Sequence, residues 1–357
     1  MEQIEIDGAE GEGGGQVIRT SVSLAALTGK MVEIVNVRAN RSKPGLQAQH
    51  LTAVRAAAAL CNAELKGAEL GSQFLRFAPK ALTDKSDFAF DVAEARRGAS
   101  AGATGLVAQT LLVPMAFLPG SPATATILGG THVPMAPPAD YIEAVYAPML
   151  ARMGATARVT LDRAGFYPRG GGAISLRVSG RLDAPIDLTE RGKLKRLRVF
   201  LVTSQLASHV AERGRDALAK ELKGYGVPIL AEIREREGNG AGAAIILVAE
   251  CENGIGGWTE LGERGKPMEK VALDAARAFQ KWFATGAAVD EHLADQLALP
   301  CALIPVESRW TTPTVTEHLR TVLQIIARFL PIEYRIEPKE NGLSLVTLCG
   351  VSTFAGS

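Results

Sequence analysis

One order of secondary structure recurs along this chain. The first eighty residues alternate β-branched runs with helical segments in the order strand, helix, strand, helix, strand, strand. Residues 86–179 repeat that order, from SDFAFDV to GAISLRV. Units of this kind bury their apolar faces against one another, so the repetition predicts an α+β fold with three βαβαββ repeats in one large domain.

The third unit is interrupted by a second pattern. Its first strand, APIDLT, is separated from its first helix, VDEHLADQLALP, by a stretch that has its own strands and helices. We expect a large domain from 1–189 and 286–357, and an inserted α/β domain over 190–285. The insert has a thioredoxin-like βαβ-ββα order but no CxxC pair, so a redox role is not expected.

Prolines and glycines suggest where the helices begin and end. The first helix should stop at Gly29, a second should start with Pro44 as its first residue, and LIPVES should form a strand. Each first helix carries a glutamine, and each second helix opens near a proline: Gln16, Gln109 and Gln296, and Pro44, Pro137 or Pro138, and Pro313. Packing about a pseudo-threefold axis would gather helix N-termini and glycine loops into an anion site.

Composition excludes several classes of protein. The net charge of the 357 residues is +1, so contact with nucleic acid would require a local cluster of charge and would show a shallow salt dependence. The four cysteines are far apart, which favours a reduced compartment and disfavours a zinc site. MEQIEIDGAEGEGG does not resemble a secretory signal, and the longest apolar run is too short to span a bilayer. We expect a soluble, cytoplasmic protein without a membrane partner.

His318 lies at the start of a predicted helix. Thr314 and Glu317 have the spacing of a capping box, which places His318 at about the fourth helical position. The helix dipole there disfavours imidazolium, so a neutral, nucleophilic ring is expected near pH 7. From the residues alone, a boundary histidine held by one hydrogen bond is favoured over a nucleophile.

Two loops carry candidate groups for binding phosphate and metal. In DGAEGEGGGQVIRTS, glycines precede a helix, and Glu12, Gln16, Arg19 and Ser23 share one polar face. Glu12 is a candidate ligand for a divalent cation and Arg19 for a phosphate, while the alternative is a solvated face. Arg38, Arg41 and Lys43 form either a phosphate clamp or a solvated loop.

The remaining histidines are assigned from their surroundings. His292, Asp295 and Gln296 lie within one helical turn and are candidates for reading a base or ribose, although surface placement is the alternative. A structural role is expected for His50. No role is assigned to His132 or His209.

Seven stretches in this order resemble RNA 3′-terminal phosphate cyclase over essentially the whole chain. They are GAEGEGGGQVIRT, RANRSKPGLQAQHLTAV, ELGSQ, GGTHVPMAPPADY, GFYPRGGG, HLADQL and EHLRT. The resemblance implies a large domain of three repeats like the C-terminal domain of translation initiation factor three, with a smaller insert in the third repeat.

The resemblance also implies a reaction. ATP and Mg²⁺ or Mn²⁺ are used, and a histidine attacks the α-phosphorus to give a histidinyl–AMP adduct and pyrophosphate. AMP then passes to an RNA 3′-phosphate, and the adjacent 2′-OH closes a 2′,3′-cyclic phosphate and releases AMP. The partner is therefore an RNA 3′-phosphate end, with DNA ends and a homodimer left open.

Site residues follow from the same resemblance. His318 stands at the position of the nucleophile, and Glu12 at that of the metal-associated acid. The implied nucleotide-binding residues are Gln109, Pro137, His292, Leu293, Ala294, Asp295 and Gln296, with Pro137 and His292 flanking adenine. The implied contacts to the substrate phosphate are Arg19, Arg38, Arg41 and Gln49.

The chain departs from the family pattern at Ala164, Val322 and His292. Other classes also remain open. A non-catalytic factor of the same fold that processes ribosomal RNA would be expected to lack the histidine, so His318 favours the enzyme. An enolpyruvyl transferase has similar repeats but would form no AMP adduct.

Overall fold

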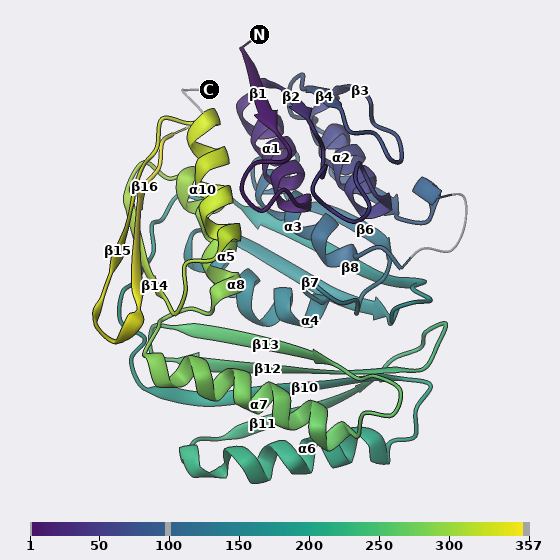
Figure 1. Cartoon of the computed structure of the whole chain (residues 1–357), viewed down its shortest axis with the longest axis vertical. Coiled ribbons are helices and arrows are strands. Elements are labelled where there is room, and N and C mark those ends of the chain that lie inside the picture. Colours follow the sequence, from purple (N-terminus) through teal and green to yellow (C-terminus); the bar gives the residue numbers. More distant parts are fainter. Residues whose placement is uncertain (1, 97–100, 353–357) are drawn as a thin grey trace.

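The computed structural model describes residues 2–96 and 101–352. In these residues the chain forms four sheets of four strands each, with helices packed against them (Figure 1). The α+β class is confirmed. The first sheet has the order β1-β2-β4-β3 and is accompanied by two helices. The strands are β1 (Gln3–Asp7), β2 (Met31–Val35), β3 (Glu64–Lys66) and β4 (Leu75–Ala78), and the helices are α1 (Gly15–Thr28) and α2 (Ala48–Cys61).

The second sheet has the order β5-β6-β8-β7. Its strands are β5 (Asp87–Asp91), β6 (Ala123–Gly129), β7 (Ala155–Arg163) and β8 (Gly172–Gly180). A short 3₁₀ helix, η1 (Glu94–Arg96), follows β5, and α3 (Thr104–Met115) precedes β6. A continuous helical segment precedes β7 and consists of α4 (Ala139–Tyr141), the π-helical turn η2 (Ile142–Tyr146) and α5 (Ala147–Arg152).

The third sheet has the order β9-β14-β16-β15 and joins distant parts of the chain. Its strands are β9 (Asp187–Leu188), β14 (Glu307–Thr312), β15 (Glu333–Pro338) and β16 (Ser344–Cys349). Its helices are α8 (Glu291–Gln296), α9 (Ala298–Ala302), α10 (Glu317–Phe329) and the 3₁₀ helix η4 (Glu340–Gly342). In all three sheets the order is first, second, fourth, third strand, and only the first pair is parallel.

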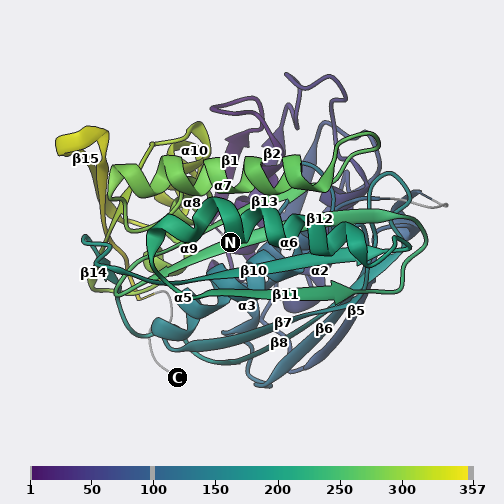
Figure 2. The same cartoon turned by 90° about the horizontal axis from the view of Figure 1, so that it is seen from below.

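The fourth sheet is formed between β9 and α8, with the order β11-β10-β12-β13. Its strands are β10 (Leu194–Ser204), β11 (Ile229–Glu235), β12 (Gly242–Cys251) and β13 (Ile255–Leu261), and its helices are α6 (His209–Leu222), η3 (Lys223–Tyr225) and α7 (Met268–Thr285). Both long helices lie on one face of this sheet, at the bottom of Figure 1 and nearest the viewer in Figure 2.

The fourth sheet has two buried faces. Successive β12 side chains point to opposite sides, so Ile245 and Leu247 pack with α6 and α7, whereas Ile246 and Val248 join the core shared with the other sheets. The helix 139–152 covers this second face, where a Cβ at Gly257 would lie 2.6 Å from Val145 Cγ2. The inserted residues are therefore fixed to the rest of the molecule by apolar packing as well as by chain connections.

Several predicted boundaries can be compared with the structure. Gly29 does end α1, with φ of 70°, as predicted. Pro44 as the first helical residue was wrong, because α2 begins at Ala48. The predicted bounds of the strand at LIPVES were also wrong. Leu303 and Ile304 are buried next to α9, and β14 begins only at Glu307. Trp310 of this strand is buried.

The start of α2 is capped by a pair of side chains. The backbone N–H of Gln47 donates to Nδ1 of His50 at 3.2 Å, and the His50 backbone N–H donates to the Gln47 carbonyl. Burial, together with the charges of Arg38 and Arg19, lowers the pKa of His50 to about 3. The structural role expected for His50 is thus accounted for by this cap.

Within the two described segments, no helix is both long enough and apolar enough to cross a membrane. The cysteines Cys61, Cys251, Cys301 and Cys349 are all unpaired thiols.

The shared core predicts that the inserted residues do not unfold separately. Trp310→Phe leaves Trp258 and Trp282 as fluorescence probes of the insert, to be compared with far-ultraviolet circular dichroism of the whole chain in urea. The two transitions should coincide, and Ile246→Ala should lower the free energy of unfolding by about 2–4 kcal/mol for both probes. A separate early transition seen only by fluorescence would contradict this prediction.

The buried cap predicts a pH dependence of stability. Between the unfolded pKa of about 6.5 and the folded value, the unfolded chain binds a proton that folded His50 does not. This group should therefore cost the wild type about 2–3 kcal/mol of stability between pH 7 and pH 4.5. In His50→Gln the side-chain oxygen can accept the same hydrogen bond from the Gln47 N–H. The free energy of unfolding, measured in urea, should then fall by about 2–3 kcal/mol less between pH 7 and pH 4.5 than in the wild type. Equal losses in both proteins would contradict the assignment.

Candidate active site

His318 is the second residue of α10. The cap is Thr316, whose hydroxyl accepts from the Leu319 N–H at 3.1 Å, so the predicted Thr314 cap was wrong. The Thr314 carbonyl instead accepts from the Thr312 hydroxyl at 3.2 Å, within the preceding turn. His318 therefore lies in the first turn, with its side chain 40% exposed.

Glu12 fixes the orientation of the imidazole. Nδ1 of His318 lies 2.8 Å from Oε2 of Glu12, which comes from the glycine-rich loop before α1. The contact with Glu12 raises the pKa of His318, and the charges of Glu12 and Asp295 raise it further. Burial and the charge of Arg19 act to lower this pKa, but the overall shift is upward. The expectation that the helix dipole keeps the ring neutral was wrong in direction, because a carboxylate in direct contact outweighs the dipole. The contact leaves Nε2 as the nitrogen free of Glu12.

The glycine-rich loop is tied to α10 and to the neighbouring basic loop. The Glu12 N–H donates to the Thr321 hydroxyl at 3.3 Å, one turn beyond His318. Arg41 forms an ion pair with Oε1 of Glu12 and also donates to the Glu12 carbonyl at 3.1 Å. Burial alone raises the pKa of Glu12, but His318 and Arg41 together hold the pKa below its usual value.

Glu12 is a single carboxylate and could hold a metal ion only together with ligands that do not come from protein side chains. Among the residues that the structure describes, no group of three or more His, Cys, Asp or Glu side chains could hold a metal ion. Mg²⁺ in nucleotide enzymes is commonly held by one or two carboxylates, with phosphate oxygens and water completing the shell. The donor set therefore fits a divalent ion that binds with a polyphosphate, and it does not fit a metal cage made by protein side chains alone.

A small polar cavity lies where the helices of the three sheets meet. It has a volume of about 40 Å³, which is room for a few water molecules. Gln16 of α1, Gln109 of α3 and Gln296 of α8 all line it. The structure thus brings together the three glutamines that the sequence places in the first helix of each unit.

Two opposite charges line the same cavity. Arg19 is buried, and burial lowers its pKa to about 10 while Asp295 and Glu12 act to raise it. Burial raises the pKa of Asp295 to about 7 despite the nearby charges of His318, His292 and Arg19. The polar face of α1 is therefore an internal surface, and the solvated alternative is excluded. Val322, one turn beyond His318, completes the wall.

Asp290 positions the predicted nucleotide-binding run. Its buried carboxylate accepts from the backbone N–H groups of His292 and Leu293 at 2.9 Å, from Gly257 N–H of β13 at 3.0 Å and from Tyr141 Oη at 3.3 Å. His292 is exposed at the start of α8. Leu293 and Ala294 are fully buried, so neither residue presents surface to a ligand in this structure.

Two further predicted phosphate-binding residues have structural partners. Arg38 donates to the carbonyls of Lys43 and Gly45 at 2.6 and 2.9 Å, which folds its side chain back onto its own loop. Gln49 Oε1 accepts from the Ala103 N–H at 3.0 Å, at the start of α3. Arg41 therefore pairs directly with Glu12, and the charge of Arg19 acts on both His318 and Glu12. Arg38 and Gln49 instead brace the surrounding loops.

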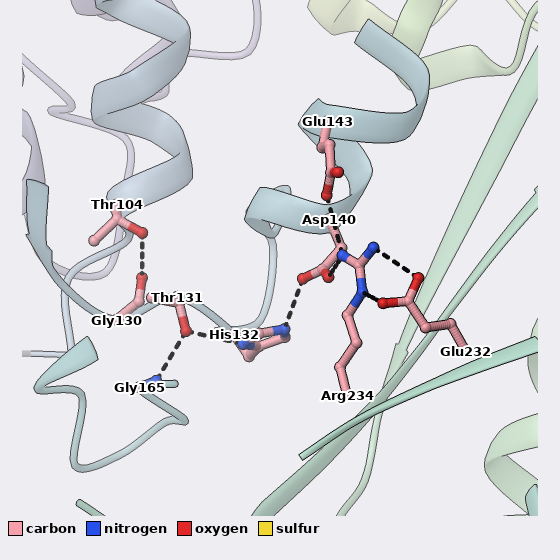
Figure 3. Close-up of polar contacts among 9 residues, drawn as sticks. All are labelled: Thr104, Gly130, Thr131, His132, Asp140, Glu143, Gly165, Glu232 and Arg234. Carbon is pink, nitrogen blue, oxygen red and sulfur yellow. Dashed lines mark hydrogen bonds and ion pairs between the residues drawn. The ribbon is translucent and has the colours of Figure 1, made fainter. Parts of the chain in front are cut away.

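The loop between β6 and α4 includes Pro137 and is braced by a network around His132 and Asp140 (Figure 3). His132, to which no role was assigned, has Nδ1 2.9 Å from the Thr131 hydroxyl and Nε2 3.5 Å from Asp140 Oδ2. Asp140 also forms an ion pair with Arg234 of β11 at 2.6 Å. Burial acts to raise the pKa of Asp140, but His132 and Arg234 lower it overall.

The same loop packs closely on α3. A Cβ at Gly105 would lie 1.9 Å from the Pro137 carbonyl oxygen, so the approach requires glycine. Gly105 lies one helical turn before Gln109. Pro137 and Gln109, predicted to bind the same nucleotide, are thus attached to the same helix surface.

Sequence reasoning missed the residues that hold the site together. Asp290, Thr321, His132 and Asp140 act through partners more than a hundred residues away or across a loop. Asp290 alone carried a usable signal, because an Asp directly before a helical run is a typical N-cap.

The Glu12 contact predicts the charge state of His318. Removing the carboxylate in Glu12→Gln should lower the pKa of His318, because the group that stabilises imidazolium most directly is lost. Histidine NMR of the metal-free protein, assigned with His318→Asn, would measure the change. Asp295→Asn, which removes a more distant charge, should lower the pKa less. A pKa that stays the same or rises in Glu12→Gln would contradict the assignment.

Comparisons with known proteins identify the family of the chain. Residues 10–336 match the family described as RNA 3′-terminal phosphate cyclase. A protein of that name from Methylococcus capsulatus is 44% identical over 352 residues, covering 98% of this chain and 97% of its own. Others from Nostoc punctiforme and Trichormus variabilis are 43% and 45% identical, covering 97% and 91% of this chain and 99% and 94% of theirs. The chain belongs to the RNA 3′-terminal phosphate cyclase family of enzymes.

Proposed function

We propose that this protein uses ATP to convert an RNA 3′-terminal phosphate into a 2′,3′-cyclic phosphate, with His318 as the nucleophile. The observation that carries the proposal is the His318–Glu12 contact at the start of α10. It holds Nδ1 of a partly exposed imidazole and leaves Nε2 free of Glu12, and the charge of Arg19 acts on the ring. A non-catalytic relative would not require an oriented imidazole at this position.

The orientation of the ring matches the first step. With its proton on Nδ1 facing Glu12, His318 presents the Nε2 lone pair for attack on the α-phosphorus of ATP. A P–N bond forms and the bond from the α-phosphorus to the bridging oxygen breaks, which releases pyrophosphate. Arg19 and Arg41 offset the negative charge that gathers in the transition state. A divalent ion held by Glu12 and the phosphates would supply further charge neutralisation.

The later steps use the same groups. An oxygen of the RNA 3′-phosphate attacks the adenylyl phosphorus, the P–N bond breaks, and His318 is restored. The adjacent 2′-oxygen then attacks the 3′-phosphorus, losing its proton to solvent, and AMP leaves. Because the 2′-OH is already tethered beside the phosphorus, this step needs mainly positioning and charge neutralisation.

We further propose that the predicted nucleotide-binding residues hold ATP between two helix starts. Pro137 precedes α4, and His292 is the second residue of α8. Tyr141 and Asp290 connect these two helices through their hydrogen bond. Proline and imidazole rings at these positions would flank the adenine. Gln109, Asp295 and Gln296 extend from the same surface into the polar cavity.

We also propose that the three sheets of common strand order are copies of one unit, as in the C-terminal domain of initiation factor three. The common strand order and the convergence of Gln16, Gln109 and Gln296 support this proposal. Residues 190–285 would then be a thioredoxin-like insertion in the third copy, and the large domain would comprise 1–189 and 286–357.

Labelling with α-³²P-ATP and Mg²⁺ or Mn²⁺, without RNA, tests the proposal. The wild type should acquire a label that is lost in acid and stable in alkali, as expected for a phosphoramidate. His318→Ala should reduce the label below detection, because His318 is the only histidine that contacts Glu12 among the described residues. His209→Ala removes an exposed histidine on α6 and should label like the wild type.

No label on the folded wild type with either metal would contradict the proposal. The protein would then be better described as a non-catalytic relative that binds RNA. A label that survives in His318→Ala would place the nucleophile elsewhere.

A further inference from the structure

Positive charge is concentrated in one segment of a nearly neutral chain. Residues 152–181 contain Arg152, Arg158, Arg163, Arg169, Arg177 and Arg181, and a single acid, Asp162. This gives the segment a net charge of +5 in a chain whose total is +1. All six arginines are exposed. The segment consists mainly of the β7–β8 hairpin.

The outer face of this hairpin places like charges together. Arg158 and Arg177 are directly opposite each other in the antiparallel register. The neighbouring pairs on that face are Thr156 with Ser179 and Thr160 with Ser175. Neither Arg158 nor Arg177 has an acidic partner among residues 2–96 and 101–352, and the carboxylate of Asp162 accepts from Ser175 instead.

Within the described part of the chain, helices cover only the other face of this sheet. α3 lies against β6 and β8, while α4 and α5 lie against β7. In Figure 2 the sheet forms the lower margin of the molecule, and no helix lies beyond it. Like charges directly opposite on a sheet are destabilising, so the packing of the hairpin gives no reason for the Arg158–Arg177 pair.

The hairpin leads toward the proposed nucleotide site. Its turn is attached to the loop that carries Pro137, because Gly172 pairs with Gly129 and the Tyr167 N–H donates to the His132 carbonyl at 3.1 Å. Arg163 and Arg169 lie at this end of the hairpin. Tyr167, in the turn, is 64% exposed and has an aromatic face available to a ligand.

We propose that the outer face of the β7–β8 hairpin binds the phosphodiester backbone of the RNA upstream of its 3′-phosphate. This inference rests on the proposed function for the identity of the ligand. Exposed arginines without acidic partners, set among hydroxyl groups, suit a chain of phosphates. Tyr167 provides a stacking surface for a base near the reacting end.

The binding test uses an unreactive ligand, a fluorescent 20-nucleotide RNA with a 3′-hydroxyl, followed by anisotropy over a range of salt concentrations. Arg158→Gln/Arg177→Gln should bind about tenfold more weakly near 0.1 M salt. The slope of log affinity against log salt should become shallower by about 1–2, since each lost phosphate contact contributes about 0.7 for a single strand. Tyr167→Ala should bind more weakly with the slope unchanged, because stacking releases no counterions.

A matched control removes the same charge elsewhere. Arg277→Gln/Arg335→Gln changes two exposed arginines on α7 and β15 and should bind RNA like the wild type. The melting temperature of Arg158→Gln/Arg177→Gln should equal or exceed that of the wild type, because the substitution removes a repulsion. Weaker binding therefore cannot be attributed to unfolding.

Two readouts separate this inference from the proposed function. His318 labelling by ATP, and the KM for a dinucleotide 3′-phosphate, should be the same in Arg158→Gln/Arg177→Gln and in the wild type, while the KM for a 20-nucleotide 3′-phosphate RNA rises. RNA affinity equal to that of the wild type, or an equal loss in the control variant, would overturn the inference. Absence of the label in the wild type would overturn the proposed function and leave the anisotropy result readable.

Discussion

The burial of α1 on nearly every side is the constraint on which the rest of the structure depends. Eleven of its fourteen residues are buried, and it packs against α2, α3 and α10. Its polar side chains therefore have to find partners inside the protein. Arg19 donates to Gln16, and the Ser23 hydroxyl donates to the Thr110 carbonyl at 2.9 Å. The polar cavity where the three helix systems meet follows from this requirement.

The same packing sets the electrostatics of His318. Because α10 lies against α1, the loop before α1 reaches the first turn of α10, and Glu12 meets both His318 and Thr321. Arg19 and Asp295 then act on His318 with opposite signs from the cavity wall. Their effects are smaller than that of Glu12, which is in direct contact with the ring.

The inserted residues are bound to the rest of the chain at points next to the site. Gly257 of β13 donates to Asp290, which caps α8, and Arg234 of β11 pairs with Asp140 beside the Pro137 loop. Both carboxylates are buried, so loss of either partner would leave an uncompensated group in the interior. The insert thus supports the geometry of the predicted nucleotide-binding surface without supplying any of its predicted residues.

The sequence by itself determined the order of the elements and supplied the candidates for the site. Periodicity of apolar residues is a local property. The glycine at position 29 and the glutamine in each of three helices can also be recognised without tertiary contacts. The exact starts of α2, β14 and α10 were missed because the local sequence allows more than one start for each element. Tertiary packing decides which of these starts is used.

Only the tertiary structure decided which candidates meet. Glu12 and His318 are 306 positions apart, so their contact, and with it the direction of the His318 pKa shift, depends on how α1 and α10 pack. Asp290, Asp140 and His132 become significant only when distant strands and loops enclose them. Likewise, Arg158 and Arg177 are unremarkable in sequence and become a paired charge only through strand register. Local patterns fix what each segment can form, whereas long-range burial fixes the solvent access and charge around each side chain, on which the chemistry depends.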